Sequence, residues 1–169
     1  TNGKTTTCHL IASVLEAAGE KVGMTTTIDF QIGAERTENN IKMTTVSPFH
    51  LQKLLKRMVK AECSAAIIEV TSIALDQHRL WGIPFQTVVF TNLPHDHLDY
   101  HKTYTKYVQA KAKLLKNVRL AIVNKSDQSY PLITPLIPKK TKIIPYNQSS
   151  LNKSLRLVIE KRFPEIYNQ

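Results

Sequence analysis

The sequence opens with TNGKTTT, which contains the residue types that bind a nucleotide phosphate. Gly3-Lys4-Thr5 matches the second half of the phosphate-loop pattern G-x-x-x-x-G-K-[ST]. Glycine lets the backbone approach the phosphates, and N–H groups at the start of the following helix point at the anion. In such a loop the lysine reaches the β- and γ-phosphates, and the threonine hydroxyl ligates Mg²⁺. The stretch therefore predicts a nucleotide site, with a chance GKT at a helix cap as the alternative.

Two later stretches suggest other chemistry. NKSD (124–127) matches the guanine-specifying N-K-x-D of GTPases, but no D-x-x-G switch lies between it and the phosphate loop. HDHLDYH (95–101) gathers histidines and aspartates, as metal sites do. One extra residue before its last histidine separates it from the H-x-H-x-D-H of metallo-hydrolases. Since it follows a predicted strand, we interpret this stretch as part of a ligand crevice at the carboxyl end of a sheet.

The apolar pattern predicts the elements that must position these residues. Helices are expected where apolar residues recur every three to four positions, and buried strands where short apolar runs occur. Strands that alternate with helices predict an α/β fold of the phosphate-loop type, with a mostly parallel sheet and helices on both faces. The stretch 29–42 is polar, and no helix or strand is assigned to it. The expected elements are helices at 5–18, 48–61 and 104–116, a short helix or turn at 72–80, and strands at 21–28, 64–70, 86–92, 120–124 and 142–146.

The composition excludes several classes of protein. A chain of 169 residues suits one domain. No apolar run approaches the roughly 20 residues of a membrane span, so no membrane partner is expected. The net charge of +10 is spread along the chain without interleaved aromatic residues, so no nucleic-acid partner is expected. Cys8 and Cys63 are expected to be reduced thiols of a cytoplasmic protein.

A long, ordered set of motifs lies in residues 69–115, EVTSIALDQHRLWGIPFQTVVFTNLPHDHLDYHKTYTKYVQAKAKLL. In these motifs the chain resembles the Mur ligases. The family pattern is E-V-S-S-x-x-L-x-x-x-R, then F-T-N-L-x-x-D-H-L-D-Y-H-x-x-x-x-Y-x-x-A-K. The chain is closest to the MurE branch, the UDP-N-acetylmuramoyl-tripeptide synthetases. The opening resembles the family's G-T-N-G-K-T-T-T loop without its first glycine, and NIKMTTVSP resembles its N-T-T-P segment. Met43, Thr71 and Ile73 depart from the family's usual asparagine, serine and histidine.

The resemblance covers residues 1–147 and implies the central ATP-binding domain of a three-domain enzyme, clipped within its phosphate loop. These enzymes use ATP and Mg²⁺ to add an amino acid to a UDP-MurNAc-peptide, here UDP-MurNAc-L-Ala-D-Glu, through an acyl phosphate. We therefore expect a monomer that binds this peptide and an amino acid, and a fragment that is inactive alone. The tail 148–169, with a short amphipathic helix, is left unassigned. The alternatives are another such ligase, for example MurF, MurC, folylpolyglutamate synthase or cyanophycin synthetase, and an inactive nucleotide-binding remnant.

The resemblance also implies a role for individual residues. Lys4, His97 and Lys111 are expected to be catalytic, with Lys111 converted by CO₂ to a carbamate whose negative charge suits a metal-rich site. Glu69 ends a predicted buried strand, where its carboxylate can hold Mg²⁺. Three sets follow: metal ligands Thr5, Glu69, His97 and Lys111; nucleotide-binding residues Asn2, Gly3, Lys4, Thr5, Thr6, Asn124 and Asp127; and peptide-binding residues Thr44, Thr45, Thr71, Gln77 and Arg79.

Overall fold

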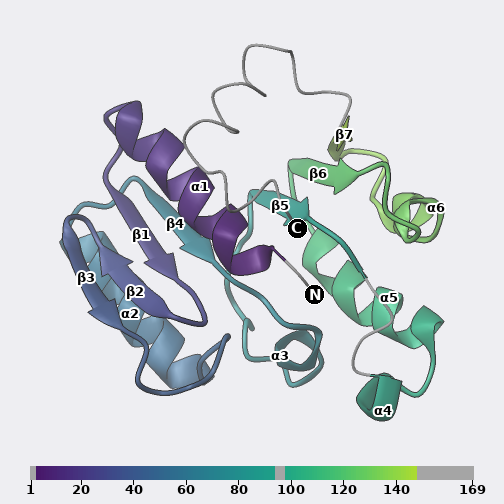
Figure 1. Cartoon of the computed structure of the whole chain (residues 1–169), viewed down its shortest axis with the longest axis horizontal. Helices are drawn as coiled ribbons and strands as arrows, with labels where there is room; N and C mark the ends of the chain where they lie inside the picture. The colour runs from purple at the N-terminus through teal and green to yellow at the C-terminus, as the bar shows by residue number, and fades with distance from the viewer. Residues whose placement is uncertain (1–2, 94–97, 148–169) are drawn as a thin grey trace, which may run out of the picture.

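The computed structural model of the chain describes residues 3–93 and 98–147 (Figure 1). Helices and strands alternate along most of it, which confirms the predicted α/β class. The helices are α1 (Lys4–Ala17), α2 (Pro48–Lys60), α3 (Ser72–Asp76), α4 (Leu98–His101), α5 (Tyr104–Ala112) and α6 (Tyr130–Ile133), with 3₁₀ turns η1 (Lys113–Leu115) and η2 (Thr134–Leu136). The strands are β1 (Val22–Thr25), β2 (Asp29–Ile32), β3 (Glu35–Glu38), β4 (Ala65–Ile68), β5 (Thr87–Phe90), β6 (Leu120–Asn124) and β7 (Lys142–Tyr146).

The first sheet has the strand order β3-β2-β1-β4. Strands β1 and β4 are parallel, whereas β2 and β3 form an antiparallel hairpin on the outer side of β1. No strand was predicted in residues 29–42, so this hairpin was missed. The outer strand of the hairpin has no alternation of apolar and polar residues, because all of β3 is exposed at the sheet edge. Its two-residue turn begins at Gly33, whose φ of 60° suits glycine at that position.

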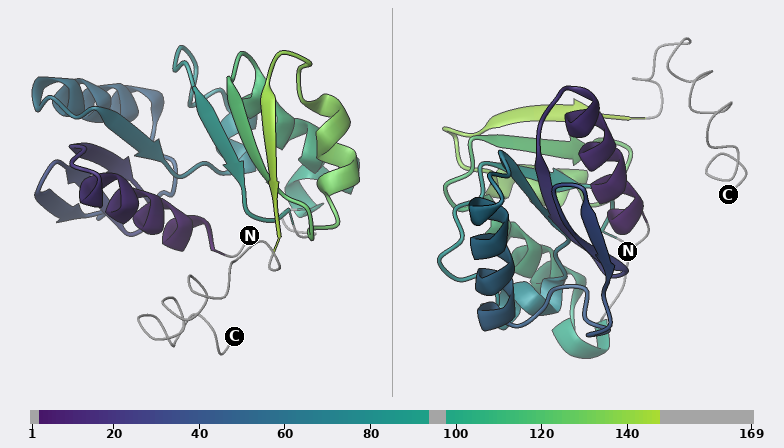
Figure 2. Two further views of the ribbon diagram at one scale, coloured as in Figure 1. Left: turned by 90° about the horizontal axis from the view of Figure 1, so that it is seen from above. Right: turned by 90° about the vertical axis from the view of Figure 1, so that its left-hand side faces the viewer.

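Helices α1 and α2 cover opposite faces of this sheet (Figures 1 and 2). Alternation along β1 divides its side chains between the two helices. Val22 and Met24 pack with the α1 residues Cys8 and Ala12. Gly23 faces the other way, toward Met58 of α2. For this sheet, the prediction of helices on both faces is confirmed.

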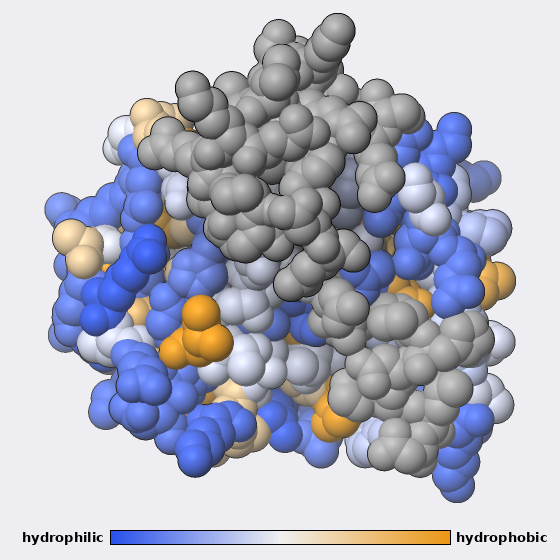
Figure 3. Space-filling view, in the orientation of Figure 1, coloured by the Kyte–Doolittle hydropathy of each residue, from blue (hydrophilic) through white to orange (hydrophobic). Residues whose placement is uncertain are grey.

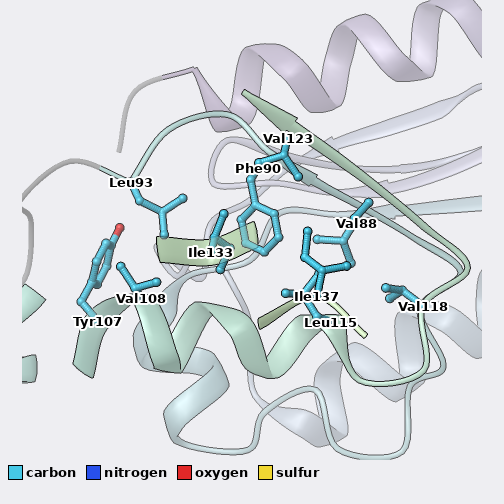
Figure 4. Close-up of a cluster of buried hydrophobic side chains, with 11 residues drawn as sticks. Val88, Phe90, Leu93, Tyr107, Val108, Leu115, Val118, Val123, Ile133 and Ile137 are labelled. Carbon is cyan, nitrogen blue, oxygen red and sulfur yellow. The ribbon is translucent and has the colours of Figure 1, made fainter. Parts of the chain in front are cut away.

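The second sheet is parallel throughout, in the order β5-β6-β7. Its core lies between the sheet and the helices α5 and α6. Val88, Phe90 and Val123 of the sheet, Val108 of α5 and Leu115 of η1 belong to one buried cluster, which Figure 4 shows in close-up. The single turn of α6 is too short to produce a helical period in the sequence, so it was not predicted.

Within residues 3–93 and 98–147, the two sheets do not share a strand pair. The chain passes from the first to the second through β4, α3 and β5, and the two halves lie side by side in the view from above (Figure 2). The sequence predicted one sheet, and the structure has two. The face shown in Figure 3 is largely hydrophilic, with hydrophobic residues scattered over it. No helix in the described part of the chain is long and apolar enough to cross a membrane.

The packing of Gly23 against Met58 gives a test of this core. A methyl group added at Gly23 would lie 2.5 Å from Cγ and Sδ of Met58, which is buried. We expect Gly23→Ala to lower the free energy of unfolding by about 1–3 kcal/mol, because the added atom overpacks the interface. Met58→Ala alone should cost about 2–5 kcal/mol. In a double-mutant cycle measured by denaturant unfolding, the double variant should lose less free energy of unfolding than the two single variants together, because the smaller side chain at residue 58 makes room for the added methyl group. Strictly additive losses would show that the two residues do not touch.

Candidate active site

The phosphate-loop residues lie at the start of helix α1, as predicted. Gly3 precedes the helix with φ 78° and ψ 0°, a left-handed conformation that glycine adopts without steric cost. Its carbonyl accepts a hydrogen bond from the Thr7 N–H at 2.9 Å. Lys4 is half-buried at the first helical position, and Thr6 is exposed. The first turn of an α-helix leaves its N–H groups without partners inside the helix, so the start of α1 can bind an anion. Asn2 lies outside the described residues.

Glu69 connects the phosphate-loop helix to the first sheet. It follows β4 directly, is only 3% exposed, and its N–H bonds to the Thr25 carbonyl at 2.9 Å. One carboxylate oxygen, Oε2, accepts three hydrogen bonds: from Thr5 Oγ1 at 2.9 Å, from the Thr27 N–H at 2.9 Å and from Thr27 Oγ1 at 3.0 Å. Hydrogen bonds to an ionised group are stronger than those between neutral groups. They stabilise a buried carboxylate at the carboxyl end of β4.

Thr27 belongs to this site and was not predicted. Besides its two bonds to Glu69, its hydroxyl lies 3.0 Å from the Thr44 hydroxyl. It thereby joins the Glu69 carboxylate to a residue expected to bind the peptide substrate. The signal in the sequence was its position, since Thr27 follows β1 at the same edge of the sheet where Glu69 follows β4.

The residues expected to bind the peptide form one hydrogen-bonded cluster beside Glu69. The buried Thr45 hydroxyl donates to the Glu69 carbonyl at 3.0 Å and accepts from the Thr71 N–H at 3.1 Å. Thr71 caps α3, because its hydroxyl accepts from the Ala74 N–H at 3.2 Å. Arg79 donates to the Thr45 carbonyl at 2.8 Å and, through Nε, to Oε1 of Gln77 at 2.8 Å. These contacts orient the loop residues, and they occupy the Thr45 hydroxyl on both sides.

Lys111 is a buried polar side chain in the second half of the described chain. It sits on α5, is 6% exposed, and its Nζ lies 5.8 Å from the centre of the Tyr107 ring. Both Lys111 and Glu69 line the same groove of about 590 Å³. His97, the other predicted catalytic residue, lies outside the described residues. Among residues 3–93 and 98–147, no three His, Cys, Asp or Glu side chains come together into a group that could hold a metal ion by themselves.

Asn124 and Asp127 join the carboxyl ends of β5 and β6. The Asn124 amide donates to the Thr91 carbonyl at 2.9 Å, and Asp127 Oδ1 accepts from the Leu93 N–H at 3.3 Å. Asp127 also accepts from the N–H of Ser129 at 3.0 Å. The two side chains therefore fix the loop that follows β5. Contact with a nucleotide base remains a prediction for both.

Cys8 lies beside Glu69 on α1 and is buried. Burial, followed by the negative charge of Glu69, raises the pKa of its thiol from 9.0 to about 12. The thiol is therefore protonated at neutral pH, and it is unsuited to act as a nucleophile or a metal ligand. Neither Cys8 nor Cys63 forms a disulfide in the structure.

With this geometry in view, comparison with known proteins identifies the family. The model of the Mur ligase middle domain matches residues 1–163. The chain belongs to the Mur ligase family. This confirms the resemblance found in the motifs of residues 69–115. The prediction of a boundary at residue 147 stays a prediction.

Other Mur ligases show which branch this chain is similar to. A UDP-N-acetylmuramoyl-L-alanyl-D-glutamate–2,6-diaminopimelate ligase of Clostridium acetobutylicum is 42% identical over 128 residues, covering 76% of this chain and 26% of that protein. The corresponding ligase of Parabacteroides distasonis is 36% identical over 166 residues, covering 96% and 33%. A solved structure of a ligase of the same name has a TM-score of 0.78 at 31% identity, covering 90% of this chain and 31% of that one. The chain thus spans about a quarter to a third of the length of these relatives.

The site's donor set fits Mg²⁺. Thr5 supplies a hydroxyl oxygen and Glu69 a carboxylate oxygen, and hard divalent cations prefer such oxygen ligands. The two oxygens lie 2.9 Å apart, at the start of the helix that would face a nucleotide phosphate. A half-buried lysine, Lys4, lies next to them in the chain. The arrangement can therefore hold a metal-bound nucleotide against the end of the first sheet.

The two cysteines provide a test of the site's electrostatics. At pH 8, a thiol whose pKa rises from 9.0 to about 12 holds about 1,000-fold less thiolate. Labelling of the native protein with a disulfide reagent should therefore modify the partly exposed Cys63 first and Cys8 far more slowly. Equal labelling rates for Cys8 and Cys63 in the native protein would contradict the raised pKa of the Cys8 thiol.

The same shift makes stability depend on pH. Folding favours the neutral thiol of Cys8, so its contribution is intact below pH 9.0 and is lost as the pH rises from there toward 12. Between pH 8 and 10.5, we expect unfolding measurements to show a smaller loss of stability for Cys8→Ala than for the unmodified chain. Cys63→Ala serves as the matched control and should follow the unmodified chain. Parallel curves for all three proteins would contradict the shift.

Proposed function

We propose that this chain is the ATP-binding part of a ligase that adds an amino acid to UDP-MurNAc-L-Ala-D-Glu in peptidoglycan synthesis. The contact between Thr5 and the buried Glu69 carboxylate carries the proposal, because it places a metal-binding oxygen pair at the start of the phosphate-loop helix. Membership of the Mur ligase family and similarity to diaminopimelate-adding ligases support it. The amino acid is proposed to be selected by parts of the intact protein other than this chain.

In the first step, the peptide's terminal carboxylate attacks the γ-phosphate of ATP and forms an acyl phosphate and ADP. Both reactants are anions, so the site must offset their repulsion. Lys4 and the N–H groups of α1 would face the phosphates. Thr5 and Glu69 would hold Mg²⁺, which supplies charge neutralisation at the transferring phosphoryl group. In the second step the incoming amine displaces phosphate and forms the amide.

The peptide substrate would lie along the cluster of Thr44, Thr45, Thr71, Gln77 and Arg79. Arg79 suits a carboxylate because its planar guanidinium donates two parallel hydrogen bonds. Its present partners are the Thr45 carbonyl and the Gln77 side chain, so Gln77 orients the guanidinium. Thr45 is buried with its hydroxyl engaged on both sides. We therefore propose that Thr45 positions the loop, whereas Thr44, half-buried beside Thr27, faces the substrate.

Lys111, which lines the same groove as Glu69, is proposed to carry the carbamate. An ammonium group is costly to bury, whereas a carbamate would bring negative charge to a cationic, metal-rich site. His97 is proposed to join Lys111 at the second metal ion. Asn124 and Asp127 are proposed to lie near the nucleotide base, and the enzyme is proposed to act as a monomer in the cytoplasm. A different ligase of this family remains the second candidate, since Ile73 replaces the histidine that is usual in the MurE branch.

The direct test uses the intact protein that contains this chain, supplied with ATP, Mg²⁺ and bicarbonate. Phosphate release should require both UDP-MurNAc-L-Ala-D-Glu and one amino acid from a panel that includes meso-diaminopimelate and lysine. Glu69→Gln should lower this activity at least about 100-fold, since even residues that only orient metal ligands cost 10–100-fold. Glu38→Gln, on the exposed edge strand β3, is the matched control and should leave it unchanged.

Three other results would count against the proposal. Release with a different nucleotide-sugar peptide would favour another ligase of the family. No release from a folded protein that binds ATP would favour an inactive remnant. Full activity of Glu69→Gln would remove the carboxylate from the proposed metal site.

A further inference from the structure

A row of three oxygen atoms connects the buried Glu69 carboxylate to the hydroxyl group of Thr44. Glu69 Oε2 lies 3.0 Å from Thr27 Oγ1, and Thr27 Oγ1 lies 3.0 Å from Thr44 Oγ1. Both distances are within the range of O–H···O hydrogen bonds. Glu69 is 3% exposed, whereas Thr44 is only half-buried. The row therefore runs from a buried charge to a hydroxyl group that a ligand can reach.

Thr27, in the middle of this row, has one hydroxyl hydrogen for two neighbours. A hydroxyl group donates one hydrogen bond and accepts through two lone pairs, so Thr27 cannot donate fully to both Glu69 and Thr44. Glu69 Oε2 also accepts from the Thr27 N–H at 2.9 Å and from the Thr5 hydroxyl at 2.9 Å, as an ionised carboxylate does. Hydrogen bonds to an ionised acceptor are roughly twice as strong as neutral ones. The hydroxyl hydrogen of Thr27 therefore points at Glu69.

The direction of this first hydrogen bond determines the direction of the second. Since its hydrogen is used by Glu69, Thr27 Oγ1 presents lone pairs to Thr44, and the contact between the two threonines is a hydrogen bond only if Thr44 donates. The single hydrogen of the Thr44 hydroxyl is then directed inward. Hydrogen bonds linked in this way polarise one another, which strengthens each of them. Toward a ligand, Thr44 therefore offers lone pairs, which accept hydrogen bonds and cannot donate them.

The backbone on both sides of the contact between Thr27 and Thr44 is held by one buried amide. Asn39, which is 6% exposed, donates from its side chain to the Thr26 carbonyl at 2.8 Å and to the Met43 carbonyl at 3.0 Å. Thr26 precedes Thr27 in the chain, and Met43 precedes Thr44. The Asn39 amide therefore holds the two threonine backbones together independently of their hydroxyl groups. The fold aligns the two hydroxyl groups before any ligand binds.

An acceptor at this position distinguishes between the groups of a substrate. An amide N–H can donate to Thr44, whereas the oxygens of an ionised carboxylate have only lone pairs and would face the lone pairs of Thr44. Arg79, in the same cluster, has the opposite character, because a guanidinium group only donates. The cluster thus contains one acceptor for an N–H group and one donor for an anionic group.

We propose that Thr27 is a specificity-determining residue that positions the hydrogen of the Thr44 hydroxyl. By donating to Glu69, Thr27 makes Thr44 an acceptor for an amide N–H of the peptide substrate and leaves the carboxylates of that substrate to donors such as Arg79. Thr27 acts through Thr44 and does not itself touch the substrate. The identity of the substrate rests on the proposed function, whereas the directions of the two hydroxyl hydrogens do not.

Neutron diffraction from deuterated crystals of the intact protein, without ligands, tests the directions of the two hydrogens. We expect the Thr27 deuterium on the line to Glu69 Oε2 and the Thr44 deuterium on the line to Thr27 Oγ1. A Thr27 deuterium directed at Thr44, or a Thr44 deuterium directed at solvent, would overturn the proposal. Because no substrate is present, this result does not depend on ligase activity.

Calorimetry with the intact protein, without ATP or Mg²⁺, tests the consequence for binding. The ligands are UDP-MurNAc-L-Ala-D-Glu and two ester analogues, in which oxygen replaces the N–H of L-Ala or the N–H of D-Glu. We expect one analogue to bind about 10-fold more weakly than the peptide, because a hydrogen bond is lost and the ester oxygen faces the lone pairs of Thr44. Thr27→Val has nearly the same shape but no hydroxyl group. The Thr44 hydrogen can then rotate outward, and the preference for the peptide should fall to about 2-fold or less.

Three further variants separate this role from a general effect on folding. Thr27→Ser keeps a hydroxyl group and should keep the preference for the peptide over that analogue. Thr37→Val, on the exposed edge strand β3, is the matched control for the loss of a threonine hydroxyl and should also keep the preference. If Thr27→Val does not fold, Thr44→Val removes the acceptor itself and should lower the preference to the same extent.

Two binding results would overturn the proposal. One is an unchanged preference for the peptide in Thr27→Val or Thr44→Val, and the other is equal binding of the peptide and both analogues by the unmodified protein. Failure of the folded protein to bind the peptide at all would contradict the proposed function as well as the substrate assigned to Thr44, whatever the neutron result.

Discussion

The buried carboxylate of Glu69 is the interaction on which the candidate site depends. A charge that is 3% exposed must be compensated, and here a single oxygen accepts three hydrogen bonds. Those bonds bring together three segments distant in the sequence: the start of α1, the loop after β1 and the end of β4. The Glu69 carbonyl adds a fourth through Thr45. Burial, followed by this same charge, raises the pKa of the nearby Cys8 thiol, so Glu69 contributes to both the geometry and the electrostatics of this end of the sheet.

The surrounding fold holds that carboxylate in place from two directions. Parallel pairing of β1 with β4 sets Thr25 against Glu69, and α1 packs on one face of the pair while α2 packs on the other. Close approach of α2 needs Gly23, because any side chain there would meet Met58. Lys111 belongs to α5, which packs on the second sheet, and it lines the same groove as Glu69. The site thus lies at the carboxyl ends of parallel strands, where open α/β sheets bind ligands.

Much of this arrangement could be predicted from the sequence, and the rest could not for identifiable reasons. Apolar residues at helical spacing predicted α1, α2 and α5, and short apolar runs predicted the strands β4 and β5, although β4 is only partly buried. The β2–β3 hairpin was missed because its outer strand is exposed and polar, so no alternation marks it. Thr27 was missed because its importance comes from the pairing of β1 with β4, a long-range contact that local sequence does not record. The division into two sheets was also not predicted, because the sequence of each strand is equally compatible with one continuous sheet.

The central claim is that Thr5 and Glu69 form the metal-binding side of a nucleotide site. The most direct measurement is a crystal structure of the intact protein with Mg²⁺ and a non-hydrolysable ATP analogue. Our account predicts terminal phosphates against the N–H groups of Lys4 and Thr5. It also predicts a Mg²⁺ ion about 2.1 Å from the Thr5 hydroxyl, with Glu69 bonded to it directly or through one water. A nucleotide bound elsewhere, or a Mg²⁺ ion that contacts neither residue, would contradict it.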